Sequence, residues 1–225
     1  MKKFILIVAA GKGTRFRGKM PKQFELLAGK PLIVHTVSAL LKYGDDLSFF
    51  FVFDPQNMMF GKHLIRERFP ELNAEFFSGG ENRTDSVRKG VINIPDGALV
   101  AVHDAVRPFV SVNLLKEGFL IAQKKGAAVP VVPVVSALRK QEKNLFYALD
   151  DGDYAEVQTP QFFQSDLLKK AFGSVSISFR DEASLVEHAG FPVAFFRGER
   201  MNFKITYPED IKMAVALIQS QKRPN

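Results

Sequence analysis

The sequence contains no cysteine and no tryptophan, and it has no apolar run long enough to cross a membrane. Without cysteine, disulfide bonds and thiolate metal sites are excluded, and cysteine usage says nothing of the redox compartment. The N-terminus, MKKFILIVAAGKG, has the lysines, the apolar run and the small residues of a signal peptide. This apolar run is short, however, and it leads into a glycine-rich turn rather than a cleavage site. We therefore expect a soluble cytoplasmic protein that does not bind membranes.

Acidic residues are fewer than basic ones, and the chain of 225 residues carries a net charge of +7. This balance favours anionic ligands. The basic residues are scattered, and they do not interleave with aromatic residues as on an RNA-binding sheet, so we expect no nucleic-acid partner. Anionic small molecules fit better. Phenylalanine occurs 22 times and is expected to fill much of the core.

The most informative stretch is FILIVAAGKGTRFRGKMPK, residues 4–22. Its apolar start predicts a strand that is buried on both faces. Four small residues follow, which let backbone N–H groups approach an anion closely: Ala9, Ala10, Gly11 and Gly13. Five cations lie within eleven residues: Lys12, Arg15, Arg17, Lys19 and Lys22.

This loop is not a P-loop, and it is not a complete GxGxxG fingerprint, because Phe16 occupies the third glycine position. A strand, a glycine-rich turn and clustered cations suit a polyphosphate ligand. Taken alone, the pattern is equally typical of a tight surface turn with solvated cations, because short glycine motifs are common.

Hydrophobic periodicity and turn residues predict alternating strands and helices. The expected strands cover residues 4–8, 47–53, 74–77, 99–102, 127–135 and 193–196, and the expected helices cover 31–41, 58–69, 85–90, 112–125, 165–172, 181–189 and 208–219. This alternation predicts an α/β fold with a mainly parallel, Rossmann-like sheet and helices on both faces. Ligands of such sheets bind beyond the carboxyl ends of the strands, so the Ala9–Arg15 loop and Asp104 should share one crevice.

Residues 136–157 differ from the rest, because they are polar and contain the turn sequence DDGD. They predict a β-hairpin arm that protrudes from the sheet. The preceding expected strand, 127–135, contains Pro130 and Pro133, which indicate an edge or a bulge rather than a central position. There is no internal repeat and no linker, so we expect residues 1–225 to form a single domain.

Seven separated motifs then indicate a family. They are AAGKGTR at 9–15, PKQ at 21–23, GGENRTDSV at 79–87, VHDAVRPF at 102–109, QTPQFF at 158–163, DEAS at 181–184 and NFKITYPED at 202–210. Together, in this order, they resemble the 2-C-methyl-D-erythritol 4-phosphate cytidylyltransferases of the non-mevalonate isoprenoid pathway. Ribitol-5-phosphate cytidylyltransferases share most of these motifs.

The resemblance implies a nucleotidyltransferase that joins CTP to a sugar-alcohol phosphate, releases pyrophosphate and uses Mg²⁺. It also implies a homodimer in which residues 136–157 reach the partner subunit. The acceptor phosphate is itself a nucleophile, so the protein must position two polyanions and neutralise charge rather than supply a strong base. Clustered cations meet that demand.

The resemblance also implies roles for individual residues. The catalytic cations are Arg15, Lys22 and Lys204. The nucleotide is assigned to Ala9, Ala10, Gly11, Lys12, Gly13, Gly80, Glu81, Arg83, Ser86 and Asp104. The acceptor is assigned to Arg107, Thr159, Arg180 and Lys204. Asp104 would also face the metal, directly or indirectly.

The chain departs from the family pattern on the acceptor side. Ser136 and Ala137 replace the usual Asp-Thr, and Asp151 replaces an arginine that orients the acceptor phosphate from the partner's arm. Arg180 replaces a threonine, and its charge is a candidate to offset Asp151. Two alternatives therefore remain open: another polyol phosphate as acceptor, such as ribitol 5-phosphate, and a nucleotide-binding homologue without turnover.

Overall fold

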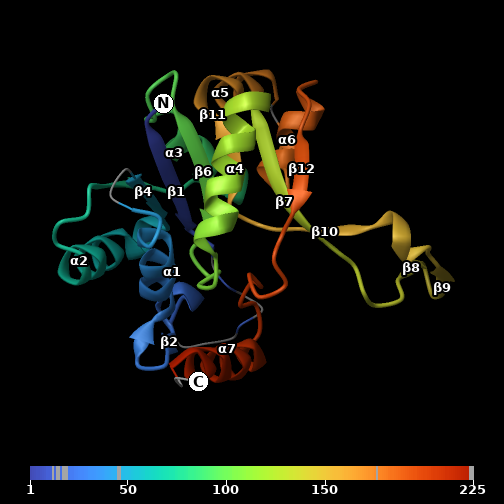
Figure 1. The fold of residues 1–225 in the computed structure, drawn as a ribbon, viewed down its shortest axis with the longest axis horizontal. Coiled ribbons are helices and arrows are strands. Elements are labelled where there is room, and N and C mark those ends of the chain that lie inside the picture. Colours follow the sequence, from blue (N-terminus) through green and yellow to red (C-terminus); the bar gives the residue numbers. More distant parts are fainter. Residues whose placement is uncertain (12, 14–15, 17–19, 45–46, 176, 223–225) are drawn as a thin grey trace.

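The computed structural model describes residues 1–225 except for residues 12, 14–15, 17–19, 45–46, 176 and 223–225. Its centre is an eight-stranded sheet (Figure 1). The strands of this sheet are β1 (Lys3–Ala9), β4 (Leu47–Phe53), β5 (Ala74–Ser78), β6 (Leu99–Asp104), β7 (Ala127–Pro133), β10 (Ala155–Val157), β11 (Gln161–Gln164) and β12 (Ala194–Arg197). The helices are α1 (Leu32–Leu41), α2 (Met58–Arg68), α3 (Arg83–Val91), α4 (Val112–Lys125), α5 (Ser165–Ser174), α6 (Glu182–His188) and α7 (Pro208–Lys222).

The strand order is β10-β7-β11-β6-β1-β4-β5, and β12 pairs with β7. The neighbours β6, β1, β4 and β5 run parallel, as does the β12–β7 pair, whereas β11 and β10 run antiparallel to their partners. The predicted α/β class with a mainly parallel sheet is therefore confirmed. Because β1 and β6 are parallel neighbours, their carboxyl ends meet at the same edge.

Alternation along the central strands supplies two separate cores. On β4, Phe49, Phe51 and Phe53 face one cluster, which α1, α2 and α4 cover. The intervening Phe50 and Val52 face the other cluster, which α3, α5 and α6 cover. Strands that are buried on both faces must be apolar throughout, which explains the continuous run LSFFFVF.

A third, smaller cluster attaches α7 to the body. Ile205 and Ala214 are fully buried there beside Leu32 of α1. The short pair β2 (Leu26–Leu27) and β3 (Lys30–Pro31) lies next to this helix, at the lower end of the molecule in Figure 1. The segment 202–207, which precedes α7, is thereby held against the loop after β6, where Ile205 N–H donates to Val106 O.

The sheet differs from the sequence-based expectation in two places. No strand was predicted for the stretch QFFQ, which forms β11 and inserts between β6 and β7. The prolines of β7 do not place it at an edge, since β12 pairs with its other side. A bulge does face Pro130: β7 advances three residues between Val131 and Ala128, while its partner advances five from Val157 to Phe162. Pro133 lies outside this bulge and pairs in register with Ala155 of β10.

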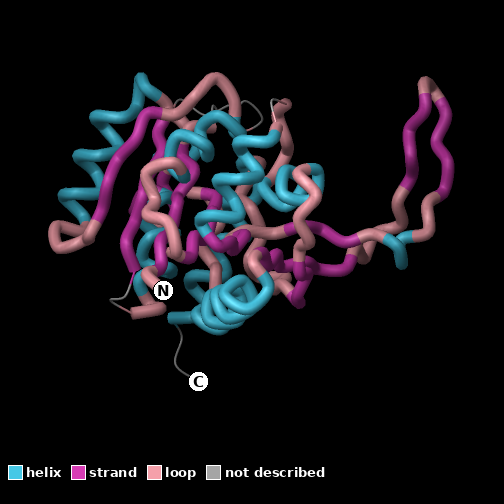
Figure 2. Tube along the Cα trace, turned by 90° about the horizontal axis from the view of Figure 1, so that it is seen from above, coloured by secondary structure: helices cyan, strands magenta, loops and turns pink. Residues whose placement is uncertain are grey.

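The predicted arm protrudes from the body (Figures 1 and 2). It consists of the hairpin β8 (Arg139–Glu142) and β9 (Leu145–Ala148), and it returns to the sheet through β10. Every residue of the hairpin strands is exposed. Among the described helices, none has the length and apolar character needed to span a bilayer.

Candidate active site

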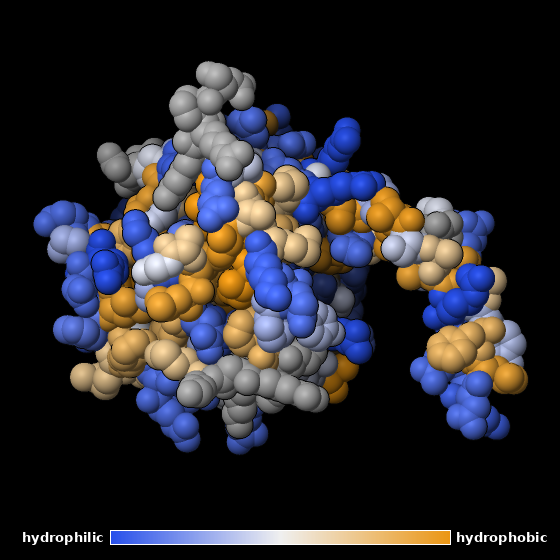
Figure 3. Space-filling view, turned by 90° about the horizontal axis from the view of Figure 1, so that it is seen from below, coloured by the Kyte–Doolittle hydropathy of each residue, from blue (hydrophilic) through white to orange (hydrophobic). Residues whose placement is uncertain are grey.

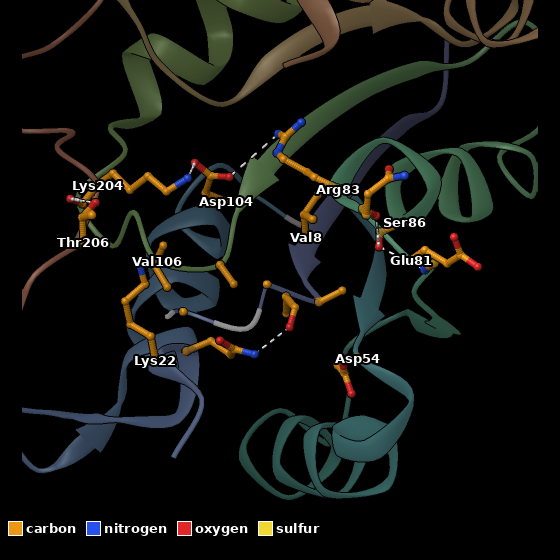
Figure 4. A pocket seen from close by; sticks show the side chains of 18 residues that line it. Val8, Lys22, Asp54, Glu81, Arg83, Ser86, Asp104, Val106, Lys204 and Thr206 are labelled. Carbon is orange, nitrogen blue, oxygen red and sulfur yellow. Dashed lines mark hydrogen bonds and ion pairs between the residues drawn. The ribbon is translucent and has the colours of Figure 1, made fainter. Parts of the chain in front are cut away.

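A pocket of about 400 Å³ opens beyond the carboxyl ends of β1 and β6, where Val8 and Asp104 are register partners (Figure 4). The glycine-rich loop, the Gly80 turn and the segment around Lys204 meet there. The lining residues are Val8, Ala9, Ala10, Gly11, Gly13, Lys22, Gln23, Asp54, Gly80, Glu81, Asn82, Arg83, Ser86, Asp104, Ala105, Val106, Lys204 and Thr206. The structure thus confirms the predicted common crevice for the described part of the loop and Asp104.

The glycine-rich loop follows β1 directly. Gly13 has a φ of +58°, a conformation that L side chains rarely adopt, and its O accepts a hydrogen bond from Phe16 N–H. The carboxamide of Gln23 donates to Ala9 O over 2.6 Å and so fixes the start of the loop. Lys12 and Arg15, two of the predicted phosphate ligands, lie outside the described residues.

A second close turn, Gly79-Gly80, forms the opposite wall of the pocket. A Cβ atom on Gly80 would lie 2.4 Å from Asp85 Cβ, so only glycine fits there. Gly80 N–H donates to Ser86 Oγ over 3.0 Å, and the Ser86 hydroxyl donates to Asn82 O. Ser86 therefore organises the start of α3 as well as lining the pocket.

Asp104 is the centre of an ionic cluster at the end of β6. Lys204 Nζ lies 3.0 Å from its Oδ2, Arg107 Nε 3.3 Å from the same oxygen, and Arg83 Nη2 3.9 Å from Oδ1. Burial raises the pKa of Asp104, but these three cations outweigh burial and hold the pKa well below its usual range. The carboxylate is therefore ionised at neutral pH, and it pairs with cations from three separate chain segments. Figure 4 shows two of these cations, Arg83 and Lys204.

Arg83 is oriented by a second carboxylate, Glu182, at the start of α6. The two side chains form a bidentate ion pair, with Nη2 to Oε2 at 3.0 Å and a second contact from Nη1 to Oε1. Burial lowers the pKa of Arg83, but the negative charges of Glu182 and Asp104 outweigh burial and raise the pKa above its usual value. The guanidinium therefore stays charged. The Gln161 Oε1 atom accepts from the N–H groups of Glu182 and Ala183 and anchors this helix end on β11.

Lys22 lies at the start of a 3₁₀ helix, Lys22–Phe24, on the loop side of the pocket. Lys22 is 8% exposed, which is unusual for lysine, because buried lysines are normally paired with other groups. Its Cβ would lie 3.2 Å from a Cβ atom built on Gly13, so the glycine lets the two segments approach closely.

A second pocket, of about 310 Å³, shares Lys204 with the first. Arg107 and Arg200 also line it, and Glu156 of β10 is the acidic residue of its wall. The predicted acceptor residues Arg107 and Lys204 therefore come together. Arg180 is exposed and lines neither pocket.

Behind the cluster, His103 is fully buried. Burial lowers its pKa to about 4, and the neighbouring cations Arg107 and Lys204 act in the same direction, so it is neutral at pH 7. Its Nδ1 lies 3.1 Å from Oγ1 of Thr159, which is also buried. Thr159, a predicted acceptor ligand, thus lies behind the cluster formed by Asp104 and Arg107.

Comparison with known proteins agrees with this geometry. Residues 4–220 match the family model described as IspD: 2-C-methyl-D-erythritol 4-phosphate cytidylyltransferase. The chain belongs to this family. A relative named 2-C-methyl-D-erythritol 4-phosphate cytidylyltransferase from Bacteroides thetaiotaomicron is 39% identical, over 97% of this chain and 100% of the relative. A crystal structure of the enzyme of that name from Thermus thermophilus is 34% identical, with a TM-score of 0.77 over 96% of this chain and 98% of the other.

A bifunctional IspDF structure from Campylobacter jejuni is also similar, with 28% identity and a TM-score of 0.80. It covers 94% of this chain, but this chain matches 54% of that one. The resemblance inferred from the seven motifs is therefore confirmed at the level of the family, and the chain is a nucleotidyltransferase.

Several residues within the family motifs help to form the site although the sequence-based assignment did not include them, and three of these hold other site residues in place. Glu182 lies in DEAS, His103 in VHDAVRPF and Gln23 in PKQ. The motifs were available as a signal, but a role for Glu182 depends on its contact with Arg83, which is 99 residues away. Pairing over that separation cannot be read from local sequence.

Magnesium, which the family chemistry implies, has a limited set of protein ligands here. No group of three or more acidic, histidine or cysteine side chains gathers among the described residues. Asp104 does offer a buried carboxylate at the pocket. Mg²⁺ is usually held by one or two carboxylates together with substrate phosphates, and a single carboxylate fits that pattern.

Proposed function

We propose that this chain transfers the cytidylyl group of CTP to 2-C-methyl-D-erythritol 4-phosphate and releases pyrophosphate, a step of isoprenoid biosynthesis. The observation that carries the proposal is the convergence of the glycine-rich loop, Lys22, Arg83, Asp104 and Lys204 on one pocket. Such a pocket suits a nucleoside triphosphate, and the chain belongs to a family of that name. CTP is a cytoplasmic metabolite, so we place the reaction in the cytoplasm.

In this proposal the triphosphate lies along Ala9, Ala10, Gly11 and Gly13, whose small side chains leave the backbone N–H groups accessible. The cytosine and ribose lie toward Gly80, Glu81, Arg83 and Ser86. An oxygen of the acceptor phosphate attacks the α-phosphorus, and the bond from that phosphorus to the bridging oxygen breaks. Pyrophosphate leaves with the bonding electrons. Because the acceptor phosphate is itself the nucleophile, no protein nucleophile is needed.

Lys22 and Lys204, which belong to different chain segments but line the same pocket, would stabilise the transition state together; Figure 4 shows both on one side of the pocket, across from Arg83 and Ser86. Negative charge accumulates on the α-phosphate and on the leaving pyrophosphate, and fixed cations in a partly enclosed site stabilise it without reorganisation. Arg15 is proposed as a third such cation. Asp104 holds Lys204 in place through its 3.0 Å ion pair.

A magnesium ion is proposed to be held mainly by the triphosphate, with Asp104 as the protein carboxylate nearest to it. When bound, the ion would neutralise part of the triphosphate charge. Asp104 is also paired with three cations of the protein. We propose that it contacts Mg²⁺ either directly or through a water molecule.

The acceptor is proposed to occupy the second pocket, with its phosphate near Lys204, where the two pockets meet. Arg107 and Arg200 supply further positive charge. Thr159 contributes indirectly, because its hydroxyl accepts from Asp104 N–H. Arg200 is a cation from the same chain, and it can offset the unfavourable Asp151 of the arm. Arg180 remains a candidate for the same role, although within one chain it lines neither pocket.

We propose that residues 1–225 work as one cytidylyltransferase domain and that residues 136–157 form a dimerisation arm. The arm exposes apolar side chains that find no core in its own chain: Leu145 is 62% exposed and Phe146 65%. Figure 3 shows hydrophobic surface on an arm that stands clear of the body. A homodimer would cover them.

Steady-state pyrophosphate release tests the proposal. CTP with 2-C-methyl-D-erythritol 4-phosphate should give a kcat/KM well above that with ribitol 5-phosphate, and CTP should be used much better than ATP, because a pocket shaped for a pyrimidine leaves polar groups unpaired around a purine. Higher kcat/KM with ribitol 5-phosphate would favour the alternative acceptor. Tight CTP binding without turnover on either acceptor would favour a binding protein.

A further inference from the structure

His103 is the buried titratable residue to which the proposed reaction gives no role. It precedes Asp104 on β6 and is fully buried, yet both ring nitrogens have partners. Nε2 lies 3.1 Å from Arg107 O, and Nδ1 lies 3.1 Å from Thr159 Oγ1. The ring therefore connects the loop that carries Arg107 to the bulge that precedes β11.

The partners determine where the protons lie. A carbonyl oxygen can only accept, so Nε2 carries the proton and donates to Arg107 O. Nδ1 is then an acceptor, and the Thr159 hydroxyl donates to it. The same hydroxyl oxygen accepts from Asp104 N–H over 3.1 Å. The single hydroxyl proton of Thr159 is committed to His103.

Asn202 extends this arrangement to the segment that carries Lys204. Its Nδ2 donates to Thr159 O over 2.9 Å, and its backbone carbonyl oxygen accepts from Arg107 Nη1 over 2.8 Å. Asn202 is fully buried. His103, Thr159 and Asn202 thus form a buried network that is hydrogen-bonded to Asp104 and Arg107. Asn202 lies two residues before Lys204, so the network also reaches the segment that carries this lysine.

We propose that His103 and Thr159 act as one positioning unit for the acceptor half of the site. This inference rests on the proposed function. His103 touches no reacting atom; it acts through the backbone of Arg107, and Thr159 acts through the backbone of Asp104. The pair fixes the positions of Asp104 and Arg107, and through Asp104 the position of Lys204. The glycine-rich loop and the Gly80 turn hold the nucleotide independently of this pair.

The consequence is a split between the two substrates. Breaking the His103–Thr159 hydrogen bond should weaken acceptor binding and lower kcat about tenfold, which is the order of one buried hydrogen bond. CTP affinity should change less than twofold. Loss of folding alone would reduce the amount of active protein and leave both KM values unchanged.

A double-mutant cycle tests the unit. Thr159→Val removes the hydroxyl at nearly constant volume. His103→Gln removes the Nδ1 acceptor and keeps a donor at the Nε2 level for Arg107 O. Thr159→Val also removes the acceptor for Asp104 N–H and should be the more severe single change. Because both changes break the His103–Thr159 bond, the double variant should be little worse than Thr159→Val alone in acceptor KM and kcat. Thr159→Ser, which keeps the hydroxyl, should recover most of the lost acceptor affinity.

Ser165→Ala is the matched control. Ser165 is also fully buried, and its hydroxyl donates to Pro95 O and accepts from Ala98 N–H at the opposite end of β6. This change should lower Tm without moving either KM. Additive effects in the double variant, a parallel rise of the KM for CTP, or unchanged acceptor binding in Thr159→Val would each overturn the positioning unit.

Calorimetry separates this test from the proposed function. The Kd of 2-C-methyl-D-erythritol 4-phosphate and the Kd of CTP are measured separately on each variant, so turnover is not required. Wild-type protein that binds both substrates without releasing pyrophosphate would contradict the proposed reaction, while the acceptor Kd of the variants would still support or overturn the unit.

Discussion

Charge on single side chains carries most of the proposed chemistry, and Lys22 is the clearest test at this scale. Its Nζ is proposed to act on charge that develops during transfer, so Lys22→Ala should lower kcat by about 10²-fold or more and raise the Kd of CTP only a few-fold. Lys30, exposed on β3, is the matched control. A kcat for Lys22→Ala equal to that of Lys30→Ala would remove Lys22 from the mechanism.

The acceptor-side cations can be ranked in the same way. Arg200 lines the second pocket with Arg107 and Lys204, whereas Arg180 does not. Arg200→Ala should therefore raise the KM for the alcohol phosphate about tenfold, because a cation near a phosphate favours its binding, with little change for CTP. If Arg180→Ala has the larger effect on this KM, the sequence-based hypothesis for Arg180 is the better one.

At the residue scale, sequence motifs predicted most of the pocket but not how its residues are held. The small loop residues, Arg83, Asp104 and Lys204 line one pocket as expected. The partner of Arg83 and the links from His103 were not predictable, because they join segments that are far apart in the chain. A motif indicates that a residue matters, whereas its hydrogen-bond partner depends on the tertiary fold.

Among the elements, the turn at Gly80 supports the nucleotide half of the site. A Cβ at this position would clash with Asp85, at 2.4 Å, so Gly80→Ala should shift the start of α3 and raise the KM for CTP by about tenfold or more. Gly173 in α5 has open space around it, and Gly173→Ala should add up to about 1 kcal/mol of stability. A normal KM for CTP in Gly80→Ala would show that the turn does not shape the nucleotide site.

Element boundaries followed the sequence closely where local signals were strong. Val112–Lys125 is bounded by Ser111, whose hydroxyl accepts from Leu114 N–H, and by Gly126 with a φ of +90°. β11 was not predicted because QFFQ is short and follows Pro160, and both of its partners come from earlier in the chain. Its position depends on sheet pairing, not on local propensity.

The whole molecule presents an arm whose apolar residues lack a core. Replacing Leu145 and Phe146 together with serine should convert the proposed dimer to a monomer, because their exposed apolar area would no longer stabilise the interface. Analytical ultracentrifugation measures this directly, and Met59→Ser on α2, where Met59 is 78% exposed, is the control. A wild-type protein that is monomeric at all tested concentrations would contradict the dimer.

The central claim is that the protein transfers a cytidylyl group from CTP in the first pocket to a sugar-alcohol phosphate in the second. The most direct measurement follows CTP labelled at its α-phosphate in the presence of Mg²⁺ and 2-C-methyl-D-erythritol 4-phosphate. The account predicts that the label moves into the acceptor-containing diphosphate product, with one unlabelled pyrophosphate released for each product, and that Lys22→Ala suppresses both. Label that remains in CTP, or that appears as CMP, would contradict it.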